Sequence, residues 1–436
     1  MISTNLGMDL REKLTMSTVV SAFWTFDQTT ADSYGVYNGA MVNLAAYSTA
    51  SSSQPYLAYG RALSLTGTSN QSFLVSSPFF NLTDTSFTVE AWIYPTSFTA
   101  DLGIFSQCQC STCSQECFYI LIRSNVLYAG FTYNYLFGST TLSTSTWYHI
   151  AYVYNYATQQ QILYLNGVQD GIVSNVSPYQ GTNGSIQIGA AQLFLSTYYF
   201  TGMIDNVKLT TRAKSSTELL YTASLTAYYS FDLPSSIYDN GPNGLNGSAT
   251  STPLVTGRVN QAMRFSGSLS YFQAYGFYQV GYSMTNRPFS ISMWISPTSF
   301  TSCVIVQLSQ LQTSSTCHNL IGITQNIAVT SGQITVQGRA YPTISGPYLT
   351  LNRWTHVSLT YSIANGMTLY VNGVLFGSTG TFTFSTANVI AWLQIGYTFA
   401  CATSTLSNIG YQGSVDEIYI HSRELAQADV TALANP

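Results

Sequence analysis

Apolar and polar positions alternate with a period of two along most of this chain, which is the pattern of strands that bury one face. One strongly patterned segment places four apolar side chains on the same side of a strand: Phe87, Val89, Ala91 and Ile93. Tight hairpin turns are indicated by two Asn-Gly pairs, Asn166-Gly167 and Asn372-Gly373. Many short strands without a long helical period predict an antiparallel β-sandwich of about a dozen strands.

The patterned segments occur twice in the same order, so the chain is a tandem duplication. Three pairs of segments illustrate the repeat: Phe87–Phe98 and Phe289–Phe300, Trp147–His149 and Trp354–His356, and Leu163–Gly167 and Leu369–Gly373. Each copy ends in a short stretch of helical character, residues 215–220 and 424–430, and a Ser/Thr cap precedes Glu218. The predicted fold class is all-β, with two consecutive antiparallel β-sandwich domains.

The duplication predicts a first domain at residues 17–223 and a second at residues 224–436, joined without a Gly/Pro/Ser-rich linker. Residues 1–16 are interpreted as the tail of a preceding repeat or as a linker. Leu10–Leu14 precedes the first copy at about the spacing by which residues 218–220 precede the second. A short junction and a repeat-like N-terminus favour a longer array of such domains.

Charged residues are scarce, at 7% of 436 residues, with 13 basic and 17 acidic side chains and a net charge of -4. So few basic groups cannot neutralise a run of phosphates, which excludes electrostatic binding of nucleic acid. No run approaches the ~20 apolar residues of a membrane-spanning helix, so no membrane insertion is expected. The polar surface comes from Ser, Thr, Asn, Gln and Tyr, which suits contact with sugars or other proteins.

Cysteines and glycosylation sequons point to an oxidising compartment. Seven cysteines occur: Cys108, Cys110, Cys113, Cys117, Cys303, Cys317 and Cys401. Five Asn-x-Ser/Thr sequons occur: Asn70, Asn81, Asn175, Asn183 and Asn246. We expect an extracellular glycoprotein, secreted or at the cell surface. Because the first residues lack the apolar core of a signal peptide, we also expect an excerpt from a longer precursor.

The four clustered cysteines of the first copy predict a disulfide-stapled hairpin tip. The simplest of three possible connectivities is Cys108–Cys117 with Cys110–Cys113. Zinc binding is the alternative, but gaps of one, two and three residues lack the paired spacing of zinc ribbons. The second copy has three cysteines, so any pairing leaves one thiol over, which hints at a bond to another chain.

Six motifs recur in order in both copies. In the first copy they are Trp24–Asp27, Phe87–Ile93, Trp147–Tyr154, Leu163–Gly167, Ile186–Gly189 and Gly202–Asp205. This order resembles the laminin-G-like jellyroll of the concanavalin A-like lectin/glucanase superfamily. The resemblance implies a curved two-sheet sandwich, usually extracellular, whose relatives bind glycans or proteins, often with a Ca²⁺ at a rim, or serve as architectural modules. Fold alone does not choose among these roles.

Aspartates that recur in both copies are candidate ligands for that Ca²⁺. They are Asp27, Asp32 and Asp205 in the first copy and Asp232, Asp239 and Asp416 in the second. Ca²⁺ takes about six to eight oxygens from carboxylates and carbonyls on a turn-rich loop, and residues 238–247 are such a loop. The alternative is that these aspartates cap turns and accept hydrogen bonds from backbone amides.

The residues that hydrolysis requires are missing from the sequence. Glycosidases use two flanking carboxylates, whereas Glu90 stands alone on its strand and the second copy has a serine there. The Glu-x-Asp-x-x-Glu segment of the glucanase branch, a Gly-x-Ser-x-Gly elbow and His-Glu-x-x-His are also absent. We expect structural roles for His149 and His356. Arg212 and Arg423 are expected to pair with the aspartate of the preceding strand or to cap the chain end. We predict no enzyme activity.

Aromatic residues in or beside loops are the remaining candidates for a binding surface: Tyr133, Tyr135, Tyr198, Tyr199, Tyr275 and Tyr278. Such rings stack on sugars, form the centre of a protein interface, or belong to the sandwich core. The leading hypothesis is an adhesive or structural module that contacts other extracellular proteins or copies of itself, with a repetitive or filamentous assembly as one form. The alternative is a glycan-binding lectin with a Ca²⁺-assisted or aromatic rim site.

Overall fold

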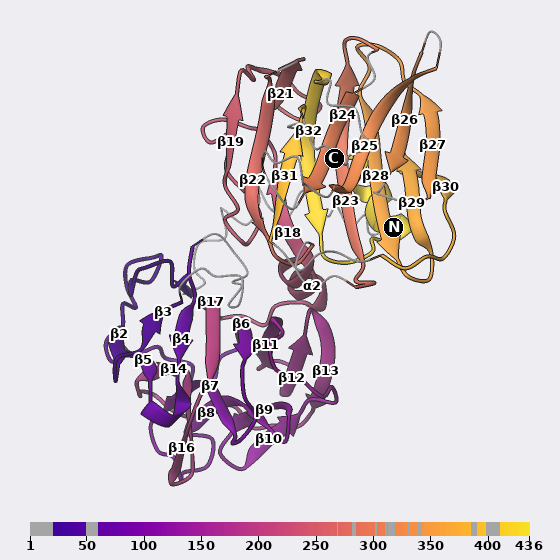
Figure 1. Ribbon diagram of the computed structural model, residues 1–436. Coiled ribbons are helices and arrows are strands. Elements are labelled where there is room, and N and C mark those ends of the chain that lie inside the picture. The colour runs from indigo at the N-terminus through magenta and orange to yellow at the C-terminus, as the bar shows by residue number, and fades with distance from the viewer. Residues whose placement is uncertain are drawn as a thin grey trace. The chain divides into compact units, whose positions relative to one another are not determined.

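The computed structural model describes residues 21–48, 60–267, 269–280, 285–300, 303–309, 312, 319–328, 331–337, 342–384, 390–397 and 410–436 (Figure 1). For residues 319–328, 331 and 337 it describes the backbone only. The described chain divides into two compact units, the first and second domains, with the boundary in the sequence between Ala223 and Ser224. No helix within these ranges is long and apolar enough to cross a membrane.

The first domain has two antiparallel sheets and a separate hairpin. The helix-side sheet has the order β13 (Val168–Val173), β12 (Gln160–Leu165), β11 (Tyr148–Asn155), β6 (Phe87–Pro95), β17 (Gly202–Thr210), β4 (Leu63–Leu65), β3 (Ala46–Tyr47), and β1 (Ser21–Trp24) also pairs with β17. The opposite sheet has the order β10 (Asn134–Phe137), β9 (Val126–Phe131), β8 (Cys117–Arg123), β7 (Leu102–Cys108), β14 (Ile186–Ile188), β5 (Ser72–Val75), β2 (Ala40–Val42). The hairpin is β15 (Ala190–Leu193) with β16 (Ser196–Tyr199).

The second domain repeats the two antiparallel sheets. Its helix-side sheet has the order β20 (Leu254–Thr256), β21 (Gln261–Ser266), β32 (Gln412–His421), β23 (Phe289–Pro297), β28 (Thr355–Ser362), β29 (Gly366–Val371), β30 (Val374–Ser378), and β18 (Leu225–Tyr229) pairs with β32. The opposite sheet has the order β19 (Gly247–Thr250), β22 (Tyr271–Phe277), β31 (Ala391–Ile395), β24 (Cys303–Ser309), β25 (Asn319–Ala328), β26 (Ser331–Gln337), β27 (Thr343–Tyr348). The predicted all-β fold of two antiparallel sandwiches is confirmed.

The inward faces of the two sheets form the core of each domain, as the period-two pattern predicts. Four side chains of β6 are at most 2% exposed: Phe87, Val89, Ala91 and Ile93. The Phe87 ring lies 5.1–6.1 Å from the centroids of four other rings, those of Phe118, Phe131, Tyr152 and Tyr154. Because full burial of one such side chain contributes about 1.5–3 kcal/mol, these layers are the main source of stability.

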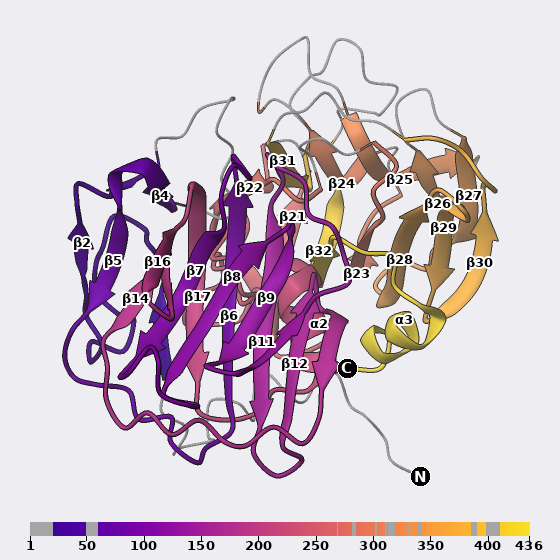
Figure 2. The same ribbon diagram turned by 90° about the horizontal axis from the view of Figure 1, so that it is seen from below.

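A short helix covers the outer face of each helix-side sheet (Figure 2). In α2 (Ser216–Ser224), Leu219 packs against Ala151, Val153 and Tyr164. The predicted cap forms here, since Ser215 Oγ accepts the Glu218 amide at 3.2 Å and Glu218 Oε2 accepts the Ser215 amide at 2.9 Å. In α3 (Gln427–Leu433), the Leu433 carbonyl accepts the Trp294 indole N–H at 3.4 Å.

Arg212 and Arg423 attach to these helices. Arg212 donates to both carboxylate oxygens of Glu218, at 3.0 and 2.6 Å, and Arg423 donates to Asp429 at 2.8 Å. The expected pairing with the aspartate of the preceding strand is therefore wrong. Those strand aspartates accept backbone amides, so the arginines bond to acids in the helix that follows.

Candidate functional site

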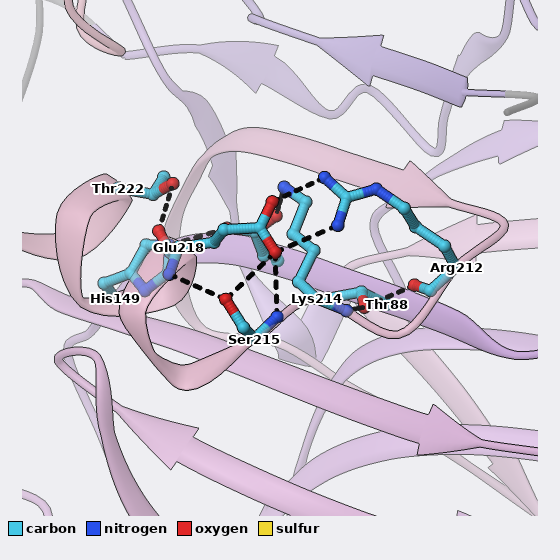
Figure 3. Close-up of polar contacts among 8 residues, drawn as sticks. Thr88, His149, Arg212, Lys214, Ser215, Glu218 and Thr222 are labelled. Atoms are coloured by element: carbon cyan, nitrogen blue, oxygen red, sulfur yellow. Dashed lines mark hydrogen bonds and ion pairs between the residues drawn. The ribbon is translucent and has the colours of Figure 1, made fainter. Parts of the chain in front are cut away.

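A buried ionic cluster lies between the helix-side sheet of the first domain and the segment that leads into α2 (Figure 3). Glu90 on β6 is 1% exposed, forms an ion pair with Lys214, and places Oε1 3.6 Å from His149 Nε2. Thr88 holds the same segment, because its hydroxyl donates to the Arg212 carbonyl at 2.8 Å and accepts the Lys214 amide at 3.0 Å. The segment is thus fixed by one ion pair and two hydrogen bonds.

Burial and charge act in opposite directions on this cluster. Burial alone would raise the pKa of Glu90, but the Lys214 ammonium and the neighbouring His149 imidazole hold that pKa well below its usual value. Burial lowers the pKa of His149 and lowers that of Lys208 to about 8. None of the charged groups that act on Glu90 is a second carboxylate. The cluster does not offer the pair of acids that glycoside hydrolysis needs.

In the second domain, uncharged residues occupy the positions equivalent to Glu90 and Lys214. Ser292 stands at the Glu90 position, and its hydroxyl lies 2.6 Å from that of Ser358. Leu425 stands at the Lys214 position, and its amide donates to Ser290 Oγ at 3.0 Å, as the Lys214 amide does to Thr88. Neutral packing replaces the ion pair in one copy, so we assign the cluster to attachment of α2 and not to a reaction.

His356 is the second-domain counterpart of His149, and its burial should make the second domain less stable in acid. It is 1% exposed, and burial lowers its pKa from 6.5 to about 4. Below pH 6.5 the unfolded chain binds a proton that the folded chain does not, so stability falls as the pH drops from about 6.5 to about 4. We expect a loss of about 2–3 kcal/mol over this range from this residue. Urea unfolding of His356→Phe should show a weaker pH dependence, and an unchanged slope would contradict the assignment.

The six aspartates predicted as Ca²⁺ ligands occupy two kinds of place. Asp32 and Asp239 lie in the loop after the first strand of their domains and accept backbone amides. Asp239 accepts three, at 2.8, 2.8 and 2.9 Å, from Tyr228, Gly241 and Leu245. Asp32 likewise accepts three, at 2.7, 3.3 and 3.2 Å, from Phe23, Val36 and Tyr37. Each carboxylate therefore holds its loop to the neighbouring strand.

The other four aspartates are Asp27 and Asp205 in the first domain and Asp232 and Asp416 in the second. In the second domain Asp416 accepts two amides of loop 257–261, at 2.8 and 3.0 Å, and Asp232 accepts a third at 3.0 Å. Burial raises the Asp416 pKa to about 8. In the first domain burial, together with the charge of Asp27, raises the Asp205 pKa well above its usual value. In the second domain the two aspartates thus hold loop 257–261, whereas in the first domain Asp27 accepts the Arg61 amide and Asp205 that of the adjacent Asn206.

These contacts fit turn capping better than a Ca²⁺ site. Among the described residues, three metal-binding side chains come within 4.8 Å of one another only at Cys110, Cys113 and Glu116. Both of these cysteines are in a disulfide. Carboxylates that already accept two or three amides have few lone pairs left for an ion that takes about six to eight oxygens. Calcium binding stays a prediction.

The clustered cysteines form two disulfides, Cys108–Cys117 and Cys110–Cys113, at the tip of the β7–β8 hairpin. This is the simplest of the three connectivities predicted from the sequence. It leaves no thiolate of the cluster to bind zinc. In the second domain Cys303 is buried in β24. The remaining two cysteines, Cys317 and Cys401, lie outside the described residues.

Removing the two disulfides is expected to have unequal effects. The Cys108–Cys117 bond closes a separation of nine residues and the other only three. The loop-entropy relation gives about 2–3 kcal/mol for the longer loop and less for the shorter. Differential scanning calorimetry of the paired Cys→Ser variants checks this order. A larger loss for Cys110→Ser/Cys113→Ser would contradict it.

All five sequon asparagines are exposed: Asn70, Asn81, Asn175, Asn183 and Asn246. Two of these side chains also bond locally, since Asn81 Oδ1 accepts the Thr83 amide at 3.0 Å and Asn246 Oδ1 accepts the Asp239 amide at 3.0 Å. A glycan on any of the five would project from the surface. Their occupancy stays a prediction.

Aromatic rings gather on the outer face of the opposite sheet of the first domain. Tyr133, Tyr135, Phe137 and Phe194 are 40–59% exposed, whereas Tyr198 is half-buried and Tyr128 is only 4% exposed. Strand alternation leaves Tyr128 on β9 and Tyr135 and Phe137 on β10 pointing outward, with centroids 4.7–5.9 Å apart. The β15–β16 hairpin packs on β7 and β8, and its Phe194 ring lies 5.4 Å from Tyr133. We call six of these residues the aromatic face: Tyr128, Tyr133, Tyr135, Phe137, Phe194 and Tyr198.

Arg123 holds two rings of the aromatic face together. Its guanidinium carbon lies 4.8 Å from the ring centroid of Tyr128 and 5.5 Å from that of Tyr198, and its Nε donates to Asp101 at 2.7 Å. Burial would lower the Arg123 pKa, but the bond to Asp101 raises it. Each cation–π contact contributes about 0.5–1 kcal/mol near a surface. The face is therefore preorganised around a fixed cation.

Comparison with protein families gives two matches in the chain, at residues 66–220 and 272–431, to the laminin G type of the concanavalin A-like lectin/glucanases superfamily. These ranges cover most of both domains. The chain belongs to this superfamily. A search of curated proteins finds no match.

Several solved structures are similar to this chain at low sequence identity. Domain 4 of an extracellular arabinanase from Geobacillus stearothermophilus, in complex with arabinotriose, is 20% identical, with 48% of this chain and 98% of that chain covered and a TM-score of 0.37. Mouse laminin α1 domains LG4-5 are 12% identical, with 88% and 95% covered and a TM-score of 0.29. A heptameric SAP-like pentraxin from Limulus polyphemus is 16% identical, with 39% and 80% covered and a TM-score of 0.31.

Three of the six aromatic residues predicted for a binding surface lie on the aromatic face of this concanavalin A-like chain: Tyr133, Tyr135 and Tyr198. Tyr199 is half-buried on the same hairpin. Tyr275 is 39% exposed in the second domain, with its ring 4.7 Å from Trp392. Tyr278 is only 4% exposed, so the surface role predicted for it is wrong.

Sequence reasoning missed Tyr128, Phe137, Phe194 and Arg123. Strand alternation could have found Tyr128, which falls between the core residues Leu127 and Ala129, whereas Arg123 is followed by Ser124 in a turn. Phe194 gives no such signal, since it lies in the turn of a hairpin whose position over β7 and β8 depends on tertiary packing.

Proposed function

We propose that this chain is a non-enzymatic adhesive module of an extracellular protein and that it binds a protein partner through the aromatic face. The observation that carries the proposal is a group of four exposed rings, Tyr133, Tyr135, Phe137 and Phe194. Two of them, Tyr135 and Phe137, pack on the buried Tyr128 ring, which Arg123 also contacts. Protein interfaces are enriched in Tyr, Phe and Arg and depleted in Lys, Asp and Glu. The whole chain has 7% charged residues, which favours the same kind of contact.

The composition of this surface favours a protein partner over a sugar. Phe137 is 48% exposed, Phe194 is 40% exposed and Leu195, in the hairpin turn, is 90% exposed. None of these side chains can hydrogen-bond a sugar hydroxyl. An apolar partner surface would bury all three, and each contributes stabilisation in proportion to the area removed from water.

An extracellular location and the lack of activity rest on separate observations. Two disulfides and five exposed sequon asparagines suit the secretory pathway. The buried carboxylate Glu90 is neutralised by Lys214, and the aspartates recurring in both domains accept backbone amides. Four rings of the aromatic face, Tyr133, Tyr135, Phe137 and Phe194, are by contrast 40–59% exposed.

Binding to a panel of purified extracellular-matrix proteins tests the proposal, with a glycan array run in parallel. We expect saturable binding to a protein that free sugars do not compete. Tyr135→Ser/Phe137→Ser should weaken it by about 2 kcal/mol, or roughly 30-fold, as truncation at an interface centre does. The matched control is Val168→Ser on β13, 65% exposed, which should bind normally. Equal binding by the double variant, or competition by sugar, would overturn the proposal.

Glycan binding is the second candidate, and the second domain supplies the observation for it. Tyr275 and Trp392 form a partly exposed ring pair on the outer face of the opposite sheet, 4.7 Å apart with an interplanar angle of 39°. Paired aromatic rings of this kind can stack on a sugar face. A glycan-array signal that Tyr275→Ala abolishes, with protein binding intact, would establish this as a separate activity.

A further inference from the structure

The edge strands β13 and β30 occupy the same position in the two domains but present different surfaces. Each is the terminal strand of its helix-side sheet, and each has a β-bulge at the equivalent position of its pairing with the neighbouring strand. In β13 the extra residue is Asp170, which lies between Gln169 and Gly171 in the pairing with β12. In β30 the extra residue is Phe376, which lies between Leu375 and Gly377 in the pairing with β29. The bulge residue determines whether each edge strand is closed or left open to pairing with another strand.

Asp170 turns inward and closes the edge of the first domain. It is 7% exposed, and its Oδ1 accepts the Ser139 hydroxyl at 3.0 Å and the Thr140 amide and hydroxyl at 3.0 and 2.6 Å. The Ser139 amide donates to the Asp170 carbonyl at 3.0 Å. The segment after β10 is thereby bonded to β13, and an inward charge on an edge strand is a known protection against pairing with other chains.

Phe376 leaves the edge of the second domain open. It is 48% exposed, and the preceding residues Val374 and Leu375 are 67% and 55% exposed. Val374–Ser378 has no charged residue and no proline. The neighbouring edge strand β27 contains Pro347, which cannot donate a backbone hydrogen bond. Among the described edges on this side of the domain, β30 is the one with neither a charge nor a proline, so its bulge is its only protection.

The strand β30 is also held rigid at both ends. At its start the Gly373 carbonyl accepts a hydrogen bond from Thr431 of α3 at 3.1 Å. At its end the Ser378 hydroxyl donates to the Asn365 carbonyl at 2.8 Å, and the Thr379 amide donates to the Met367 carbonyl at 2.9 Å. A preorganised strand loses little conformational entropy when another strand pairs with it.

We propose that β30 pairs with β30 of a second copy of this chain, antiparallel and about a twofold axis, so that the two helix-side sheets continue into one another. The outer backbone groups of an edge strand are complementary to those of the same strand turned by 180°, so one surface serves both partners. A neutral strand meets its copy without charge repulsion, and the exposed apolar side chains of the two copies cover one another. This dimer does not use the aromatic face and goes beyond the proposed function.

Sedimentation velocity of the full chain between about 1 and 200 µM tests the pairing, because so small an interface gives a weak, concentration-dependent dimer. Phe376→Asp places the first-domain residue type at the bulge and should raise the dimer dissociation constant at least about tenfold. Leu375→Lys should do the same and carries the test if the first variant does not fold. The matched control is Ile172→Asp on β13, 47% exposed, which should dimerise like the parent chain.

Hydrogen exchange locates the contact independently. The outer amides of β30 should exchange more slowly as the protein concentration rises, and those of β13 should not change. A chain that stays monomeric over the whole range would overturn the proposal. So would a dimer that survives both β30 variants, a dimer without slower exchange in β30, or assemblies larger than dimers, which indicate head-to-tail contacts.

Discussion

Replacing Glu90 with alanine is expected to lower the free energy of unfolding of the first domain by about 3–5 kcal/mol, the usual cost of removing one partner of a buried ion pair. The substitution leaves the Lys214 ammonium, whose side chain is 13% exposed, without its acceptor beneath α2. It also removes the negative charge that raises the pKa of Lys208, a pKa that burial lowers to about 8. Urea unfolding followed by circular dichroism, fitted for two domains, measures the loss.

The second domain supplies the matched control for this prediction. The triple variant Glu90→Ser/Lys208→Tyr/Lys214→Leu introduces the uncharged residues that the second domain has at the three equivalent positions. Those residues are Ser292, Tyr419 and Leu425. Neutral packing of similar volume often replaces a buried ion pair without loss, so the triple variant should recover most of the stability. A triple variant as unstable as Glu90→Ala would show that the loss comes from packing and not from an unpaired charge.

The fold could be predicted because two independent patterns agree. The alternation of Phe87, Val89, Ala91 and Ile93 fixes which face of β6 enters the core, and the duplication shows the same pattern at Phe289–Pro297. A one-residue slip would expose that whole set, so sequence alone specifies the register strongly. The helix cap at Ser215 and Glu218 is local and was equally readable.

The polar and aromatic sites depend on contacts between distant segments, which a single sequence does not reveal. Glu90 and Lys214 are 124 residues apart, so the carboxylate that stands alone on its strand has its partner at the far end of the domain. The surface position predicted for Tyr278 is wrong because a bulge in β22 interrupts the alternation just before this residue. The β22–β31 register shifts between Tyr275 and Phe277, where Gly276 has a φ of +120°. The alternation breaks there, and Phe277 and Tyr278 both become buried.

Replacing Asp239 with alanine is expected to destabilise the second domain by about 3–5 kcal/mol. Three backbone amides, at 2.8–2.9 Å, would lose a charged acceptor, and a buried donor left unpaired costs about 1–3 kcal/mol. Asp239→Asn keeps Oδ1 for the amides of Tyr228 and Gly241 but places an amino group opposite the Leu245 amide. Its loss should be about half as large. Calorimetry of both variants measures the two losses.

Chelation separates turn capping from calcium binding at the same residue. If Asp239 serves only as an acceptor for amides, a chelator such as EDTA leaves the melting temperature of the second domain unchanged, while Asp239→Ala lowers it by several degrees. If Asp239 also holds Ca²⁺, chelation lowers the melting temperature of the parent chain, because an ion that binds only the folded state stabilises it by mass action. Asp239→Asn would then lose most of its response to EDTA. The amide contacts favour the first result, since they use both oxygens of the carboxylate before any ion binds.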